Sequence, residues 1–156
     1  MVVLAIDPST VSTGWCIYDT DQDDFLEYGC IKPKSEDAIS RIIVTDTKIK
    51  ELIRLWKPEI VLVEDLAVTR NAMIVKKLAG LQIMIEVACK RSQIICVPVR
   101  PTQWRSVIGI KGRNRKEQKA NAIQYVKEKY KEVVTEDEAD AICIGEYAKI
   151  LKVEEV

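Results

Sequence analysis

Two aspartates stand three residues apart near the start of the helix that the stretch TEDEADAICIGEYA, residues 135–148, predicts. Thr135 is a good N-cap, and Glu138 completes a capping box with it. The positive end of the helix dipole is a sufficient reason for an acid at Asp137. It does not explain Asp140, which lies in the fifth helical position, on the apolar stripe that the helix should bury. A lone buried carboxylate is costly unless a cation pairs with it, so we interpret Asp140, with Asp137 on the same side of the helix, as a candidate metal ligand.

Two further acids follow apolar runs that predict buried strands. Asp7 ends VVLAID, and Glu64 lies near the end of EIVLVEDL. Each has an ordinary alternative, since Asp before Pro-Ser is a common turn residue and Glu64 with Asp65 could mark a strand exit. Active groups in an open α/β sheet gather at the carboxyl ends of strands, so Asp7 and Glu64 meet there if their strands are neighbours. Alternation along the strand puts Glu64 and Asp65 on opposite faces, so both cannot point at one site.

The chemistry of such a cluster is that of a hard divalent cation. Asp7, Glu64, Asp137 and Asp140 supply only carboxylate oxygens, which favour magnesium or manganese. The chain contains no histidine, which excludes Ser-His and Cys-His catalysis and every His-ligated metal. Four carboxylates around one point meet the requirement of two-metal phosphoryl transfer, in which one ion activates a water and the other stabilises the leaving oxygen.

Composition indicates one globular domain, residues 1–156, because 47% of the residues are hydrophobic. No apolar run is long enough to span a membrane, and the start MVVLAID lacks the basic region of a signal peptide. The five cysteines are widely spaced and form no CxxC pair, so we expect neither a zinc site nor a disulfide framework. A reducing compartment, the cytoplasm, is therefore expected.

The net charge is zero, but basic residues are concentrated in residues 100–119, where seven Lys and Arg accompany a single acid. Such a patch on a neutral protein favours a localised site for a polyanion. The commoner meaning of a short charge run is a solvated helix face, although Gly109 and Gly112 favour a loop here. The candidate phosphate-binding residues are Arg105, Lys111, Arg113, Arg115, Lys116 and Lys119.

Hydrophobic periodicity predicts an α/β fold with a five-stranded mixed sheet and helices on both faces. The first three strands should form an antiparallel meander, and the last two a parallel β-α-β unit. The expected strands are residues 2–7, 13–20, 25–31, 59–66 and 92–99, and the expected helices are 35–56, 71–91, 101–107, 116–131 and one from Thr135.

Four segments resemble RuvC-like Holliday-junction resolvases. IDPSTVSTGW resembles the opening strand and turn of that family, IVLVED its second acidic strand and EDEADAICIG its closing helix. VRPTQWRSVIGIKGRNRKEQ is similar to its basic segment. The motifs occur in the family's order over most of the chain, and the short length is most like the bacteriophage members, which would act in the cytoplasm of the host cell.

The resemblance implies an RNase H-like fold, a homodimer, and Mg²⁺- or Mn²⁺-dependent hydrolytic nicking of branched DNA. It places Asp7, Glu64, Asp137 and Asp140 on the catalytic tetrad, and Arg105 and Lys116 near basic positions that the family uses on DNA.

Two positions depart from the family pattern. Ser9 stands where glycine is usual, and Ala67 stands near the place where bacterial members carry an aromatic wedge. The missing wedge predicts cutting of forks and flaps as well as four-way junctions. The long helix from residue 71 could supply the dimer surface through Ile74, Leu78, Leu81 and Ile85, although core burial is the commoner use of such a stripe.

Three other functions remain as alternatives. The first is a branched-DNA-binding module with little or no catalysis, and the second is a ribonuclease acting on RNA–DNA hybrids. The third is an actin-like nucleotide-binding kinase, which needs two such domains and glycine-rich phosphate loops, whereas DPSTVSTG contains only Gly14. The four acids argue against the first, and the chain length argues against the third.

Overall fold

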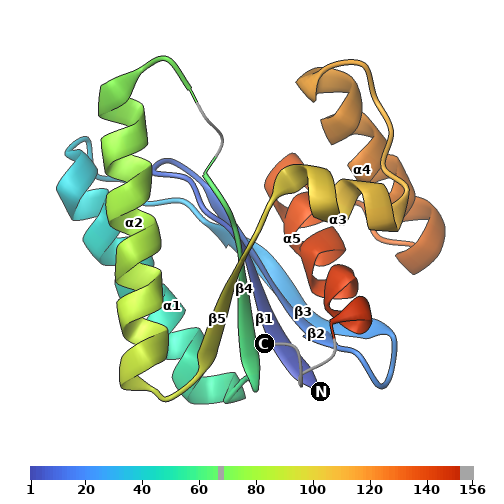
Figure 1. Ribbon diagram of the computed structural model, residues 1–156, viewed down its shortest axis with the longest axis horizontal. Coiled ribbons are helices and arrows are strands. Elements are labelled where there is room, and N and C mark those ends of the chain that lie inside the picture. Colours follow the sequence, from blue (N-terminus) through green and yellow to red (C-terminus); the bar gives the residue numbers. More distant parts are fainter. Residues whose placement is uncertain (67–68, 152–156) are drawn as a thin grey trace.

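A mixed five-stranded sheet forms the centre of the protein (Figure 1). The computed structural model describes residues 1–66 and 69–151. The strands are β1 (Val2–Asp7), β2 (Thr13–Asp19), β3 (Asp24–Ile31), β4 (Ile60–Glu64) and β5 (Ile95–Val99), in the spatial order β3-β2-β1-β4-β5. β1 and β3 run antiparallel to β2, whereas β1, β4 and β5 are parallel. The predicted meander followed by a parallel unit is confirmed.

Helices cover both faces of the sheet, as expected. They are α1 (Ala38–Trp56), α2 (Ala72–Arg91), α3 (Pro101–Ile108), α4 (Arg115–Tyr130) and α5 (Glu136–Tyr147), with a 3-10 turn, η1 (Ala148–Ile150), after α5. Figure 1 shows α1 and α2 on one side of the sheet and α3, α4 and α5 on the other. Within the described ranges, no helix is long and apolar enough to cross a membrane.

Two element boundaries differ from the prediction by about one turn. The helix expected from Ser35 begins at Ala38, because the carboxylate of Asp37 caps it by accepting a backbone N–H three residues later at 2.8 Å. The last strand begins at Ile95, three residues late, because residues 92–94 are used in the turn that ends α2. Both errors concern local capping and leave the order of elements unchanged.

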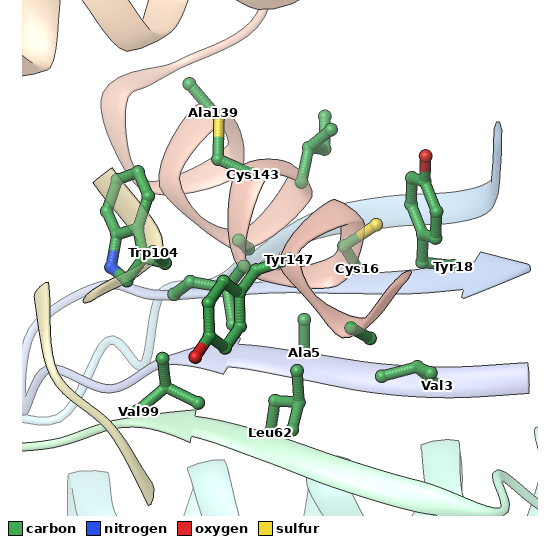
Figure 2. Close-up of a cluster of buried hydrophobic side chains, with 14 of the residues drawn as sticks. Val3, Ala5, Cys16, Tyr18, Leu62, Val99, Trp104, Ala139, Cys143 and Tyr147 are labelled. Carbon is green, nitrogen blue, oxygen red and sulfur yellow. The ribbon is translucent and has the colours of Figure 1, made fainter. Parts of the chain in front are cut away.

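Separate apolar clusters fill the two sides of the sheet. On the α5 side, Val3, Ala5 and Leu62 pack against α5 residues that include Ala139 and Cys143 (Figure 2). The alternate residues of β1 and β4 face the other way and pack against α1 and α2. This division explains why both strands are continuous apolar runs, since each is buried on both faces.

The apolar stripe of α2 belongs mainly to the core. Leu81 and Ile85 are fully buried against the sheet, so the alternative of core burial is confirmed for these two residues. Ile74 remains exposed, together with Met73, Ile83 and Val87. Any dimer surface on α2 would therefore be built from these exposed residues instead.

A buried polar network fixes the C-terminal ends of α4 and α5 to each other. The carboxylate of Glu146, which is buried, accepts hydrogen bonds from the hydroxyls of Tyr125 and Tyr130 at 2.8 and 2.9 Å. It also accepts one from the Lys129 ammonium at 2.6 Å. Since all three donors belong to α4, the network holds that helix in a fixed register against α5. The same register determines where the first turns of α4 lie.

Candidate active site

The ends of β1 and β4 bring the first two acids together. The strands are parallel neighbours with Ile6 opposite Val63, so Asp7 and Glu64 follow at the same edge of the sheet. Ala5 and Leu62 face α5, and residues two positions later leave the strand on the same face. Asp7 and Glu64 therefore point toward α5.

The first turn of α5 brings the other two acids. Thr135 caps the helix as predicted, with its hydroxyl accepting the Glu138 N–H and the Glu138 carboxylate accepting the Thr135 N–H. Asp137 takes no part in this capping box, and its carboxylate instead accepts the Ser12 hydroxyl at 2.7 Å. Asp140 is 1% exposed. The capping box thus explains Glu138, while Asp137 and Asp140 are directed at other groups.

Glycine at position 14 allows this turn to lie directly against β2. A Cβ atom on Gly14 would lie 2.0 Å from the carbonyl oxygen of Asp137 and 2.5 Å from its carbonyl carbon. Real Cβ atoms do not approach other heavy atoms so closely, so only glycine is compatible with this contact. Gly14 pairs with Asp7 across β1 and β2, so the same contact sets the distance between Asp7 and α5.

Lys119 lies among three of the four carboxylates. Its ammonium is 2.5 Å from Asp140 Oδ2, 3.6 Å from Asp7 Oδ2 and 3.9 Å from Asp137 Oδ1. The lysine comes from α4, where it shares a buried face with Ala122 and Val126. One cation thus joins acids from β1 and α5, which confirms that Asp137 and Asp140 point to the same side.

Glu64 has a different set of partners. It accepts a hydrogen bond from the indole Nε1 of the buried Trp104 at 2.9 Å. The guanidinium of Arg105 lies 4.0 Å from the same carboxylate oxygen and stacks over the Trp104 ring, 4.9 Å from its centroid. Both partners belong to α3, so this helix fixes the orientation of Glu64.

A pocket of about 160 Å³ opens onto these residues. Three of the acids, Asp7, Glu64 and Asp137, line it together with Lys119 and Arg115. Asp140 does not line the pocket, but it is joined by a salt bridge to Lys119, which does. The acids can therefore act on a group that enters from solvent.

Burial dominates the protonation behaviour of the site. It raises the pKa of Asp7 well above its usual range, and the nearby Glu64 carboxylate raises it further. Burial also raises the pKa of Asp140 to about 6, an effect that the Lys119 ammonium partly offsets. For Lys119 burial alone would lower the pKa, but the carboxylates of Asp140, Asp7 and Asp137 outweigh it and raise the pKa. The lysine therefore stays charged at neutral pH.

Comparison with known proteins identifies the family. The family description "Crossover junction endodeoxyribonuclease RuvC" matches residues 3–146, which is most of the chain. The chain belongs to this family. RuvC of Rickettsia felis is 26% identical over 156 residues, covering 98% of this chain and 100% of the relative. RuvC of Fusobacterium nucleatum is 30% identical over 153 residues, covering 92% of this chain and 78% of the relative.

Solved RuvC structures share the fold. Thermus thermophilus RuvC in complex with a Holliday junction substrate superimposes with a TM-score of 0.79 at 19% identity, over 94% of this chain and 92% of that one. A second Thermus thermophilus RuvC structure gives a TM-score of 0.76 at 22% identity, with the same coverage. The predicted RNase H-like fold is confirmed.

The donor set fits a hard divalent cation. The four side chains offer carboxylate oxygens only, and neither histidine nor cysteine is among the residues that line the pocket. Among the described residues, no three acids or cysteines already lie as a compact ligand group. Lys119 lies where such a group would form, because three of the acids contact it.

The predicted DNA-contacting residues of this RuvC chain fall into two groups. Lys111, Arg113, Arg115 and Lys116 are exposed on the loop after α3 and on the first turn of α4. The loop is ordered at Asn114, whose side chain caps α4 by accepting the Glu117 N–H at 3.0 Å. The second group has different surroundings, since Arg105 is half-buried beside Glu64 and Lys119 is buried among the acids.

Sequence reasoning missed several contacts of this RuvC site. Nothing in the motifs indicated that Trp104 would hold Glu64 or that Ser12 would hold Asp137. For Lys119 a signal was present, because it lies on one helical face with Ala122 and Val126, which are apolar. The residue near the family's wedge position, number 67, lies outside the described residues.

Proposed function

We propose that this protein is a structure-selective endodeoxyribonuclease that resolves Holliday junctions by hydrolytic nicking of phosphodiesters. The observation that carries the proposal is the meeting of Asp7, Glu64 and Asp137 at one pocket, with Asp140 joined to them through Lys119, in a chain of the RuvC family. The relatives are named crossover junction endodeoxyribonucleases, and the matching Thermus structure holds a Holliday junction. Forks and flaps are further proposed substrates.

The four acids would hold two ions, Mg²⁺ or Mn²⁺. Bound ions would supply the charge that activates a water and stabilises the leaving oxygen. The chain's own contribution is orientation: Trp104 and Arg105 hold Glu64, and Ser12 holds Asp137. A site whose ligands are fixed in advance does not need to reorganise during the reaction.

Basic residues would hold the DNA backbone next to this pocket. Arg115 lines the pocket, and Lys111, Arg113 and Lys116 extend the positive surface from it. Arg105 and Lys119 would contact the phosphate nearest the acids. The exposed first turn of α4 adds backbone N–H groups that attract a phosphate.

Two copies of the chain would act together as a homodimer, with one site on each of two opposing arms. The exposed apolar residues of α2, Met73, Ile74, Ile83 and Val87, would supply the surface between the copies. We also propose that the protein resembles the short bacteriophage members of the family and acts in the cytoplasm, that of the host cell if a phage encodes it. The five free thiols support a reducing compartment.

Cleavage of end-labelled DNA tests the proposal. Four-way junctions, three-way forks and linear duplex would be incubated with Mg²⁺, Mn²⁺ or EDTA. We expect metal-dependent paired nicks in the four-way junction, weaker cutting of forks, and no cutting of the duplex. Asp7→Asn should reduce the rate by at least about 100-fold while junction affinity is kept, because it removes charge from the centre of the ligand set.

Asp21→Asn is a matched control, since Asp21 is an exposed acid in the turn before β3, and the partner of its side chain is the N-terminal amine. This variant should cut like the wild type. Junction binding without cuts in either metal would instead support the branched-DNA-binding alternative. Full activity of Asp7→Asn would remove Asp7 from the mechanism.

A further inference from the structure

Lys119 is in a position that a surface lysine would not adopt. It is 7% exposed, although lysines are almost never buried unless they are paired. The salt bridges to Asp140, Asp7 and Asp137 satisfy the ammonium within one cluster. A positive charge therefore already lies at the place where the proposed nuclease needs its metal.

Asp140 depends on this charge more than the other acids do. Across the described ranges, Lys119 is the one side chain that donates a hydrogen bond to the Asp140 carboxylate, and it does so at 2.5 Å. Asp140 is also only 1% exposed, and it is not among the residues that line the pocket, whereas Lys119 is. A divalent ion can reach this carboxylate only after the ammonium has moved, because two cations at one oxygen repel each other strongly.

We propose that Lys119 is a built-in counter-cation that holds the acids together in the metal-free protein and competes with the first metal ion for them. The inference rests on the proposed function of the site and adds a regulatory step to it. Without Lys119, three neighbouring carboxylates would repel one another. With it, the site keeps its shape, and metal affinity is lower than four free carboxylates would give.

A DNA phosphate bound at the pocket would offer the displaced ammonium another anion. Arg115 lies one turn before Lys119 on the same face of α4, and both line the pocket. The buried Ala122 and Val126 hold the helix backbone, whereas the lysine has a flexible four-carbon stem. A DNA phosphate beside Arg115 would therefore receive the ammonium when it leaves Asp140.

This exchange couples metal binding to DNA binding. If a phosphate draws Lys119 away from the acids, DNA raises the affinity for metal, and metal raises the affinity for DNA by the same factor. The metal-loaded, cleavage-competent form would then be populated mainly on DNA.

The test is a titration of Mn²⁺ into the DNA-free protein, followed by electron paramagnetic resonance of the free ion. Lys119→Met keeps an unbranched stem and removes the charge. We expect this variant to bind Mn²⁺ about tenfold more tightly than the wild type or better, because a buried competing charge has been removed. Lys127→Met removes an exposed charge from the far end of the same helix, and its Mn²⁺ affinity should stay within about twofold of the wild type.

A second titration needs no substitution and keeps the test independent of how the variant folds. A four-way junction with nuclease-resistant phosphorothioate linkages should raise the Mn²⁺ affinity of the wild type about tenfold, and should raise that of Lys119→Met less. Thermal melting gives a third measure, in which Mn²⁺ stabilises Lys119→Met more than it stabilises the wild type.

The possible failures are distinguishable. Equal or weaker Mn²⁺ binding by Lys119→Met, with no effect of the junction on the wild type, would overturn the inference and leave the proposed nuclease intact. Absence of Mn²⁺ binding by both proteins would overturn the proposed metal-dependent function and the inference with it.

Discussion

Replacing Gly14 by alanine should damage both stability and catalysis, because it separates β2 from the first turn of α5. The added Cβ would lie 2.0 Å from the Asp137 carbonyl oxygen, and a separation of at least 3.0 Å is needed. The strand and the helix must therefore move apart by about 1 Å, the difference between the two distances. Overpacking of this kind costs about 1–3 kcal/mol. A displacement of about 1 Å at Asp137 should reduce junction cleavage about 100-fold.

Urea unfolding followed by far-UV circular dichroism measures the first effect, and single-turnover cleavage of a four-way junction measures the second. Gly80→Ala is the matched control, because a Cβ at that exposed helical position meets no atom within 4 Å. It should stabilise the protein by up to about 1 kcal/mol through helix propensity, which makes it the control for the unfolding measurement. If Gly14→Ala unfolds and cleaves like the wild type, the close contact between β2 and α5 does not set the geometry of the site.

Three further substitutions test other parts of the structure. Trp104→Phe removes the indole donor to Glu64. We expect turnover at saturating junction to fall about tenfold with unchanged junction affinity, because one hydrogen bond is lost. Equal turnover would show that Trp104 does not orient Glu64. Tyr125→Phe removes a hydroxyl that donates to Glu146, and urea unfolding should show a loss of about 1 kcal/mol. A hydrogen bond from Lys149 lowers the pKa of Asp23 from 3.8 to about 2. The folded state therefore binds that proton less well than the unfolded state, so the contribution of Asp23 is present above pH 3.8 and is lost as the pH falls to about 2. The free energy of unfolding of Asp23→Asn should therefore fall less in this acid range than that of the wild type. Identical acid titrations of the two proteins would show that the contact does not form in solution.

The order and pairing of the elements were predictable because they depend on periodicity along the chain. The apolar runs of β1 and β4, each ending in an acid, were sufficient to place Asp7 and Glu64 at one edge of the sheet. The three-residue spacing was sufficient to put Asp137 and Asp140 on one side of a helix. These features are local, or follow from general rules about α/β sheets.

The surroundings of the acids were not predictable in the same way. The contact between Ser12 and Asp137 joins residues 125 positions apart, and the contact between Trp104 and Glu64 joins residues 40 apart. Such pairs depend on the position of α3 and α5 over the sheet, which no local pattern encodes. Lys119 was grouped with the exposed basic residues because charge was counted along the chain instead of around the helix. Counting around the helix puts Lys119 on the buried face of Ala122, whereas counting along the chain puts it in the basic segment.

Packing of one face of the sheet and assembly of the acids both depend on α5. This helix contributes buried residues such as Ala139 and Ile142 to the cluster between the sheet and its helices, and it also contributes Asp137 and Asp140. It is the last α-helix of the described chain to leave the ribosome. A nascent chain that ends before residue 136 has the earlier strands but neither the packing that covers that face of the sheet nor half of the acids. Closure of the hydrophobic cluster and assembly of the acidic pocket therefore require the same helix, so we expect a chain truncated before residue 136 not to nick DNA.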